Sequence, residues 1–270
     1  MASKNFIYKI NEEHIFSKLK YFVGYEELKK KYIQIGNIVF NSNNLENVDV
    51  LDLLDISGKI LLYGDPGTGK TSLAYYIANY FLNELEIESY KISIPDLIQS
   101  NLGLTTKNMN DAIKEIKFLS ENGSIVLIID ELDRISVERS NGDEISELKR
   151  SLIEFLDFLD EVKYTNKILI IGITNSLELL DKALIRRFDF VDEIIANESD
   201  LINLFDLVLK KLKIDNVYQN EKIEFIRKYN TGDKIKKCFK KMYLETEGIS
   251  AEIKLYLENE IGGLKIWVCH

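Results

Sequence analysis

The stretch Gly64-Asp65-Pro66-Gly67-Thr68-Gly69-Lys70-Thr71 decides the fold class of this chain. It fits the phosphate-loop pattern G-x-x-x-x-G-K-[ST]. The apolar run 59–63 precedes it, and an apolar-periodic helix beginning with Ser72 follows it. Glycines let backbone N–H groups turn toward phosphate oxygens, and the positive end of the helix attracts the same anion. The spacing therefore predicts a strand, a phosphate-binding loop and a helix, in that order.

Each residue of this loop has an expected role. Lys70 can reach the β- and γ-phosphates of a nucleotide, and the Thr71 hydroxyl can ligate magnesium. We predict that the following residues bind the nucleotide: Asp65, Pro66, Gly67, Thr68, Gly69, Lys70, Thr71 and Ser72.

Composition limits the remaining possibilities. The chain has 270 residues, 46% of them hydrophobic and 29% charged, which is typical of a globular protein. A net charge of -9 opposes binding to nucleic acid. Two cysteines, Cys238 and Cys269, are too few for a disulfide framework, and we expect Cys238 to be a buried apolar residue. The sequence shows neither a signal peptide nor an apolar run long enough to span a membrane, so a cytoplasmic protein is predicted.

Strand and helix patterns alternate over the first two thirds of the chain. Apolar runs predict buried strands at 59–63, 89–94, 124–129 and 167–173, and helical patterns fall between them at 72–83, 108–120 and 145–161. This alternation predicts an α/β fold with a parallel sheet covered by helices on both faces. From residue 199 to residue 260 only helical segments follow. We predict an N-terminal extension (1–20), an α/β core (21–191) and a small all-helical domain with a short tail (192–270).

Two carboxylates end the apolar run 124–129. A strand buried on both faces is uniformly apolar, and its carboxyl end faces the ligand crevice of a parallel sheet. Asp130 can hold magnesium through a water molecule, and Glu131 can act as the general base on an attacking water. The alternative is a strand that simply stops at a polar turn. The phosphate loop favours the catalytic interpretation.

Two further groups are weaker candidates. Asn175 closes the run 167–173, where an amide can orient the attacking water, although an Asn at the end of a strand is also ordinary turn chemistry. Arg186 and Arg187 stand side by side in an acidic chain, and arginine stabilises the charge of a transferring phosphoryl group. A surface salt bridge is the other interpretation, and the arginine pair alone favours it.

Together these segments resemble the AAA clade of the AAA+ superfamily of P-loop ATPases. Residues 64–71 resemble its Walker A loop, residues 130–133 its Walker B motif and residues 174–175 its sensor 1. Residues 186–189 resemble the arginine-finger segment. Residues 22–29 resemble the opening segment that cups the adenine, and residues 231–238 resemble the lid helix that approaches the nucleotide.

The resemblance implies ATP and Mg²⁺ as ligands and ATP hydrolysis between subunits of a homo-oligomer, usually a hexamer. It adds Val23, Gly24 and Gly232 to the nucleotide-binding residues and assigns Lys70, Glu131, Asn175, Arg186 and Arg187 to catalysis. The arginines would act on the neighbour's ATP.

The chain also departs from this family. Many members carry an aromatic residue in the central pore where Asn101 stands here, and an asparagine does not grip a threaded polypeptide. The lid segment lacks an evident sensor 2 arginine, which is usual in the AAA clade and disfavours clamp loaders and initiators. The first twenty or so residues are too few to form a substrate-recruiting domain.

The sequence is compatible with three functions. The first is an ATP-driven remodeller of a protein partner. The second is a nucleotide-gated regulatory subunit of a separate effector. The third is a DNA-associated loader or initiator, whose best support is the lysine-rich segment 234–241.

Overall fold

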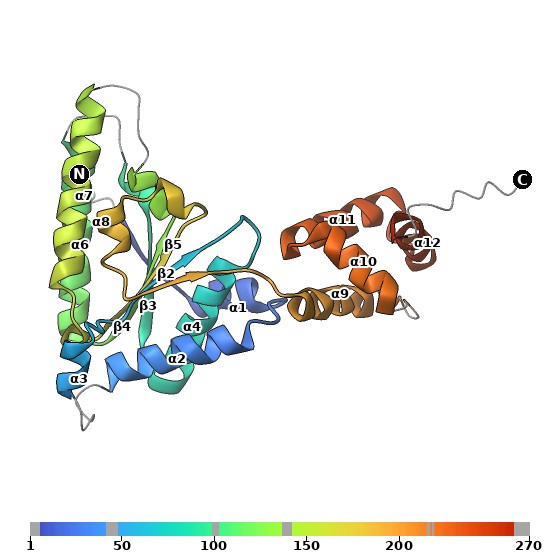
Figure 1. Ribbon diagram of the computed structural model, residues 1–270, viewed down its shortest axis with the longest axis horizontal. Helices are drawn as coiled ribbons and strands as arrows, with labels where there is room; N and C mark the ends of the chain where they lie inside the picture. The colour runs from blue at the N-terminus through green and yellow to red at the C-terminus, as the bar shows by residue number, and fades with distance from the viewer. Residues whose placement is uncertain are drawn as a thin grey trace, which may run out of the picture. The chain divides into compact units, whose positions relative to one another are not determined.

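The computed structural model describes residues 6–41, 48–98, 103–136, 142–214, 217 and 219–261. The chain forms two compact units (Figure 1). The first comprises Met1–Leu19, Glu27–Asp65 and Lys70–Ile194, and the second comprises Lys20–Glu26, Pro66–Gly69 and Ile195–His270. Each unit has its own apolar core.

The first unit is built on a six-stranded sheet in the order β1-β3-β4-β5-β2-β6. The four predicted strands are present as β2 (Lys59–Tyr63), β3 (Glu88–Ser93), β4 (Ile125–Asp130) and β5 (Ile168–Ile173), and these strands pair in parallel. Every residue of β5, and all of β4 except Asp130, is buried. This is why both strands read as continuous apolar runs.

Two edge strands were not predicted from the sequence. β1 (Ile7–Lys9) pairs antiparallel with β3, and β6 (Phe190–Glu193) pairs in parallel with β2. Along β6 half-buried and exposed residues alternate, and β1 has only three residues. Neither forms an apolar run, so neither has the signature of a buried strand.

Helices cover both faces of the sheet, as predicted. α6 and α7 lie on one side, and α1, α2 and α4 lie on the other (Figure 1). The apolar cluster on the first side joins residues of α6 and α7 to alternate residues of the strands, such as Leu61, Leu127 and Ile170. The helices of this unit are α1 (Glu12–Leu19), α2 (Glu26–Phe40), α3 (Val48–Leu53), α4 (Lys70–Leu85), α5 (Ile94–Leu97), α6 (Leu104–Asn122), α7 (Gly142–Glu161) and α8 (Lys182–Ile185), with 3-10 turns at Leu132–Ser136, Tyr164–Asn166 and Leu177–Leu179.

Asp189 fixes the start of β2, the strand that leads into the phosphate loop. Its carboxylate accepts hydrogen bonds from the backbone N–H groups of Ser57, Gly58 and Lys59 at 2.8, 2.7 and 3.0 Å. The Ser57 hydroxyl adds a fourth hydrogen bond at 2.8 Å. Several donors on one carboxylate form a strong, oriented contact. Asp189, at the end of the arginine segment, thus fixes the strand that carries the loop.

The second unit contains the helices that the sequence predicted: α9 (Glu198–Leu212), α10 (Gln219–Tyr229), α11 (Gly232–Glu245) and α12 (Ser250–Ile261). Phe205, Phe225 and Phe239 form the centre of its core, with ring centroids 5.0 to 5.6 Å apart. Cys238 is partly buried against this cluster. Side-chain caps define two of the helix starts, since Asn197 accepts from the N–H of Asp200 and Thr231 from that of Lys234.

Some predictions concern residues outside those described. They include Asn101, the tail 262–270 with Cys269, and the first five residues. Among the described helices, none is both long and apolar enough to cross a membrane.

Candidate active site

Lys70 opens α4 and lies almost completely buried in the phosphate loop. Its ammonium group donates hydrogen bonds to the carbonyl oxygens of Gly64 and Asp65 at 2.7 and 2.8 Å. Burial lowers the pKa of Lys70, and the negative charges of Asp65, Asp130 and Asp133 offset part of that shift. The motif lysine therefore lies within electrostatic reach of the two carboxylates at and beyond the end of β4.

Gly67 shows why the loop requires glycine. Its φ is +83°, in the left-handed region, and a Cβ placed on it would lie 2.3 Å from Cβ of Asp233. Asp233 belongs to the first turn of α11. A Cβ on Gly232 would in turn lie 3.8 Å from the Gly67 carbonyl oxygen. Within the second unit, the start of the predicted lid helix therefore approaches loop residues 66–69.

Asp130 ends β4, and both of its carboxylate oxygens are engaged. One accepts the N–H of Glu131 at 3.0 Å, and the other lies 2.7 Å from the ammonium group of Lys91 on β3. Glu131 has a φ of +58°, and its side chain is 47% exposed, 3.9 Å from the guanidinium of Arg134. The neighbouring carboxylates thus differ: Asp130 is held in place and Glu131 faces solvent.

These residues fit a magnesium ion bound mainly by phosphate and water. Mg²⁺ keeps several waters and typically takes one or two protein groups beside nucleotide phosphates. Within the described parts of the chain, no group of three or more His, Cys, Asp or Glu side chains could form a metal cage. Asp130 and the Thr71 hydroxyl are the predicted donors. One carboxylate and one hydroxyl suit a metal that arrives with its nucleotide.

Asn175 follows a tightly held residue at the end of β5. Thr174 is 1% exposed, and its hydroxyl donates to the Asp133 carboxylate at 3.0 Å. The backbone N–H of Thr174 also bonds to the carbonyl of Leu62 on β2 at 3.0 Å. Asn175 itself is exposed. The carboxyl ends of β2 and β5 are therefore joined, with the Asn175 amide beside them.

The structure separates the two predicted arginines. Arg187 forms an ion pair with Asp160 at 2.8 Å and donates to the carbonyl of Ala183 at 2.9 Å. Arg186 is exposed, and its side chain has no hydrogen bond or ion pair to any described residue. Arg187 is thus engaged within its own chain, which the described residues do not show for Arg186.

The predicted adenine segment packs against the helical core of the second unit. Val23 contacts that core. Gly24 has a φ of +86°, and a Cβ on it would lie 2.3 Å from a carboxylate oxygen of Asp200. Glycine is required at this position because the backbone lies directly against the first turn of α9.

Four residues with supporting contacts were missed from the sequence: Lys91 and Asp133 in the first unit, and Tyr25 and Asp200 in the second. Lys91 stands within a strand, and no spacing rule links it to Asp130, 39 positions later. In the sequence, Asp133 stands out only as part of the segment that resembles Walker B. Each acts through a contact between residues distant in the chain, which local patterns do not reveal.

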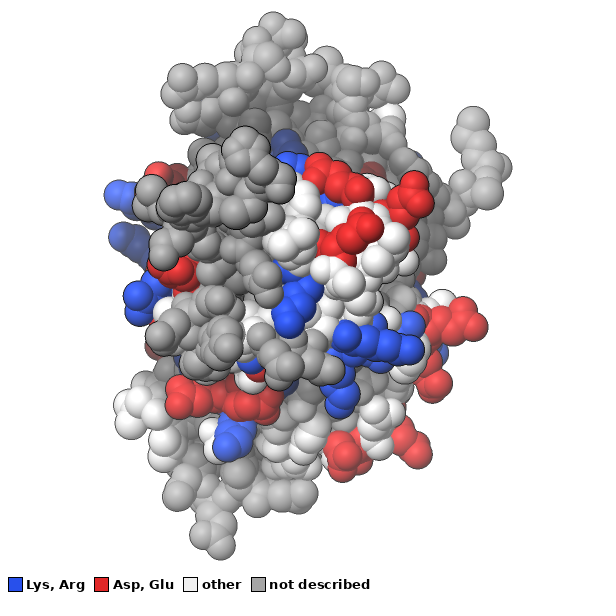
Figure 2. Space-filling view, turned by 90° about the vertical axis from the view of Figure 1, so that its right-hand side faces the viewer, with Lys and Arg blue, Asp and Glu red and all other residues white. Residues whose placement is uncertain are grey.

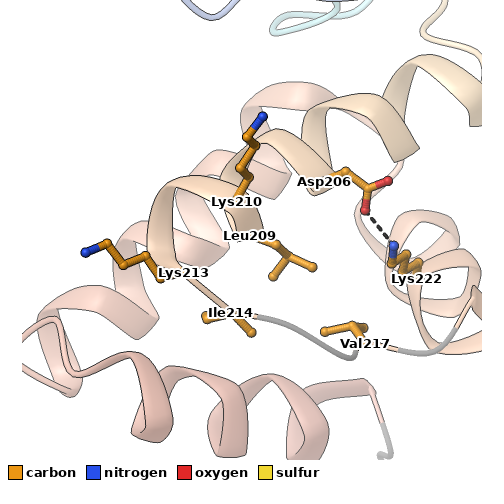
Figure 3. A pocket seen from close by; sticks show the side chains of 7 residues that line it. All are labelled: Asp206, Leu209, Lys210, Lys213, Ile214, Val217 and Lys222. Atoms are coloured by element: carbon orange, nitrogen blue, oxygen red, sulfur yellow. Dashed lines mark hydrogen bonds and ion pairs between the residues drawn. The ribbon is translucent and has the colours of Figure 1, made fainter.

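Outside this region, the helical unit has a hollow of about 480 Å³ (Figure 3). Leu209, Ile214 and Val217 line it, and Lys222 at its edge pairs with Asp206 at 2.7 Å. Figure 3 shows the ammonium groups of Lys210 and Lys213 pointing away from Leu209. The hollow therefore lacks converging polar groups from these lysines, and it contains no predicted site residue.

The face of the molecule in Figure 2 shows basic and acidic side chains next to one another. In the lysine-rich helix α11, Lys237 pairs with Asp233 at 2.7 Å and Lys241 lies 3.8 Å from Glu245. Part of the positive charge that the sequence suggested for nucleic acid is thus neutralised within the helix.

Sequence comparison places this chain among known ATPases. The model of the ATPase family associated with various cellular activities (AAA) matches residues 60–227. The vesicular-fusion protein SEC18 of Saccharomyces cerevisiae is 31% identical over 210 residues, which cover 74% of this chain and 27% of SEC18. The 26S proteasome regulatory subunit 6A of Encephalitozoon cuniculi is 32% identical over 151 residues, covering 55% of this chain and 36% of the subunit. The chain thus spans about a quarter to a third of the length of these relatives.

Two solved structures share the fold. A chain in the E. coli MS115-1 HORMA:CdnC:Trip13 complex matches with a TM-score of 0.73 at 18% identity, covering 92% of this chain and 94% of that one. The structure of C. elegans PCH-2 matches with a TM-score of 0.64 at 19% identity, covering 96% and 74%. These likenesses confirm the predicted α/β fold followed by helices. With the family match over more than half of its length, the chain belongs to the AAA family of ATPases.

Proposed function

We propose that this chain binds ATP with magnesium and hydrolyses it. The observation that carries the proposal is the buried Lys70 ammonium, which bonds to the Gly64 and Asp65 carbonyls and is influenced by Asp130 and Asp133. The phosphates of ATP would offer Lys70 charged acceptors in place of two neutral carbonyls, and charge-assisted hydrogen bonds are the stronger kind. Thr71 and Asp130 would hold the metal, which neutralises charge on the phosphates when bound.

The chain's own residues then have separate roles in ATP hydrolysis. Glu131 takes a proton from the attacking water, a role that suits a carboxylate that is 47% exposed and lies 3.9 Å from the Arg134 guanidinium. Asn175 orients that water from the end of β5. The backbone N–H groups of 65–72, apart from Pro66, which has none, hold the phosphates in line.

Arg186 would complete the site of a neighbouring copy. An arginine that approaches the transferring phosphoryl group from another subunit needs a free guanidinium at the surface. Arg186 meets that requirement among the described residues, whereas Arg187 is paired with Asp160. The resemblance to the AAA clade favours a ring, and we propose a hexamer in which 21–191 form the ATPase core and 192–270 the lid, preceded by the extension 1–20.

ATP turnover would remodel or switch a protein partner. Relatives include a protein named for vesicular fusion and a subunit named for the proteasome, and a structural neighbour was solved in a complex with a HORMA protein. The alternative is that this chain switches a protein partner without unfolding it. ATP hydrolysis would follow the same chemistry in both cases. The pairing of Lys237 and Lys241 with acidic neighbours argues against DNA as the partner.

One experiment tests both the activity and the partner. Phosphate release from Mg-ATP is measured at increasing protein concentration for the natural chain and for Lys70→Ala. We expect turnover per chain to rise with concentration and the variant to be inactive. In the presence of ATP, the Glu131→Gln variant should then retain a protein partner, whereas the Lys70→Ala variant should not. Equal phosphate release by the natural chain and Lys70→Ala would refute the proposal.

A further inference from the structure

Tyr25 adopts a backbone conformation that side chains rarely take. Its φ is +64°, and its side chain is buried, 8% exposed, directly before α2. Left-handed backbone at a bulky residue persists where surrounding contacts enforce it, and such residues cluster at functional sites. The contacts of Tyr25 therefore need an explanation.

Three segments of the second unit meet at Tyr25. Its backbone N–H donates to a carboxylate oxygen of Asp200 on α9 at 3.1 Å. Its hydroxyl donates to the carbonyl oxygen of Thr68 in the phosphate loop. Its ring stacks on that of Phe22, with centroids 5.8 Å apart and planes 9° apart. Burial, and then the charge of Asp200, raise the pKa of Tyr25, so the phenol remains a protonated donor.

The bond to Thr68 bears on the orientation of a phosphate donor. The carbonyl of Thr68 and the N–H of Gly69 belong to one peptide unit. In a planar trans peptide these two groups point in opposite directions. A hydroxyl that holds the carbonyl on one side therefore keeps the Gly69 N–H aimed at the other. Gly69, with φ +96°, lets the chain turn there, and atoms of the Tyr25 ring lie 3.4 to 3.5 Å from where its Cβ would be.

We propose that Tyr25 is a positioning residue for nucleotide binding, which orients the Thr68–Gly69 peptide so that the Gly69 N–H faces the phosphates. The inference rests on the proposed function, since it assigns that peptide to the phosphate site. Asp200 fixes Tyr25 from α9 and so determines where the hydroxyl stands. Through its hydrogen bonds, Tyr25 thus links the adenine segment, the phosphate loop and α9, the first helix of the second unit.

Tyr25→Phe tests this inference, because it removes the hydroxyl and keeps the ring. The matched control is Tyr32→Phe, which removes a second buried hydroxyl, bonded at 3.0 Å to Asp192 in the first unit. We expect Tyr25→Phe to weaken Mg-ATP binding, measured by titration calorimetry, about three- to tenfold relative to the control. KM should rise with little change in kcat, because the Gly69 N–H contacts the phosphates before and during the reaction.

A second readout does not depend on nucleotide. Hydrogen–deuterium exchange of the peptide 64–70 should be faster in ligand-free Tyr25→Phe than in Tyr32→Phe, because the Thr68–Gly69 peptide is no longer held. Tyr25→Gly would relieve the left-handed backbone, yet it should bind ATP no better than Tyr25→Phe. If Tyr25 only fills space, both phenylalanine variants would bind ATP equally and exchange at equal rates in 64–70.

These measurements separate the inference from the function on which it rests. If the natural chain binds ATP, Lys70→Ala does not, and Tyr25→Phe matches Tyr32→Phe, then only the role of Tyr25 is wrong. If the natural chain itself fails to bind ATP, the proposed function is wrong. In that case the exchange of 64–70 still decides whether Tyr25 orders the loop.

Discussion

The α/β unit has two groups of polar residues that differ in how firmly they are held. The inner group, Lys70, Asp130 and Thr174, is buried or half-buried and hydrogen-bonded. The outer group, Glu131, Asn175 and Arg186, is exposed. The difference matches two tasks. Groups that bind phosphate and metal gain from being preorganised, whereas groups that meet water or a neighbouring subunit must stay accessible.

If this division is right, outer variants should lose turnover while keeping ATP affinity, and inner variants should lose affinity. Arg186→Ala has the largest expected effect. Arginine fingers are worth about 10³–10⁵ in kcat, so turnover should fall by about a thousandfold or more with ATP affinity unchanged. Phosphate release and calorimetry measure the two quantities.

Arg187→Ala is the matched control. Loss of its partly exposed ion pair with Asp160 should cost at most about 1 kcal/mol of unfolding free energy and leave turnover nearly intact. Mixing Arg186→Ala with Glu131→Gln should restore some activity, since an intact arginine and an intact glutamate then meet at one interface. Equal loss in both arginine variants, with no recovery on mixing, would exclude Arg186 as the group acting between subunits.

Glu131→Gln should reduce turnover by about 10²–10⁴-fold, because an amide of the same shape takes no proton from water. ATP affinity should stay close to that of the natural chain, as expected of the outer group. Asp133→Asn can be compared with Glu131→Gln, because the Asp133 carboxylate accepts a hydrogen bond from the Thr174 hydroxyl. A Glu131→Gln protein with normal phosphate release would remove Glu131 from the chemistry.

Lys70→Ala tests the inner group. Hydrogen bonds to a charged partner contribute about 1.5–3 kcal/mol, so the dissociation constant for Mg-ATP should rise by about ten- to hundredfold. Calorimetry at saturating magnesium measures the change. Normal affinity together with lost turnover would place Lys70 with the outer group and contradict the comparison.

The sequence predicted the inner group better than its supports. Lys70 follows from a local pattern, Asp130 follows because two acids end an otherwise apolar run, and Thr174 was named only through the resemblance to sensor 1. Arg186 and Arg187 were equivalent in sequence, and the ion pair of Arg187 with Asp160, 27 positions earlier, distinguishes them in the structure.

The supports depend on long-range contacts. Asp189 was predicted only as part of an arginine segment, yet its carboxylate caps the start of β2. Tyr25 adopts a backbone conformation that a sequence pattern assigns to glycine. The strands β1 and β6 are short edge strands. They form because of the strands with which they pair, more than because of their own composition.

Replacement of Lys91 has the smallest expected effect, but the direction of that effect distinguishes clearly between two roles of the lysine. Its ammonium lies 2.7 Å from the Asp130 carboxylate, and both side chains are largely buried, 27% and 17% exposed. A cation at that distance competes with a metal for the same negative charge. Lys91→Met should therefore strengthen metal binding, lowering the Mg²⁺ concentration that half-saturates ATP binding by about three- to tenfold. Lys91→Arg keeps the charge and should leave that concentration near its natural value.

Magnesium titrations of ATP binding, followed by calorimetry at fixed ATP, distinguish this effect from general damage. Damage to the site would raise the Mg²⁺ concentration that half-saturates ATP binding, whereas loss of a competing charge would lower it. Lys117→Met, which breaks an exposed ion pair with Glu161 on the helical layer, controls for the loss of any lysine. If Lys91→Met raised the magnesium requirement, the lysine would be acting as a necessary support that orients Asp130. The inner group would then depend on Lys91 as firmly as on its hydrogen bonds.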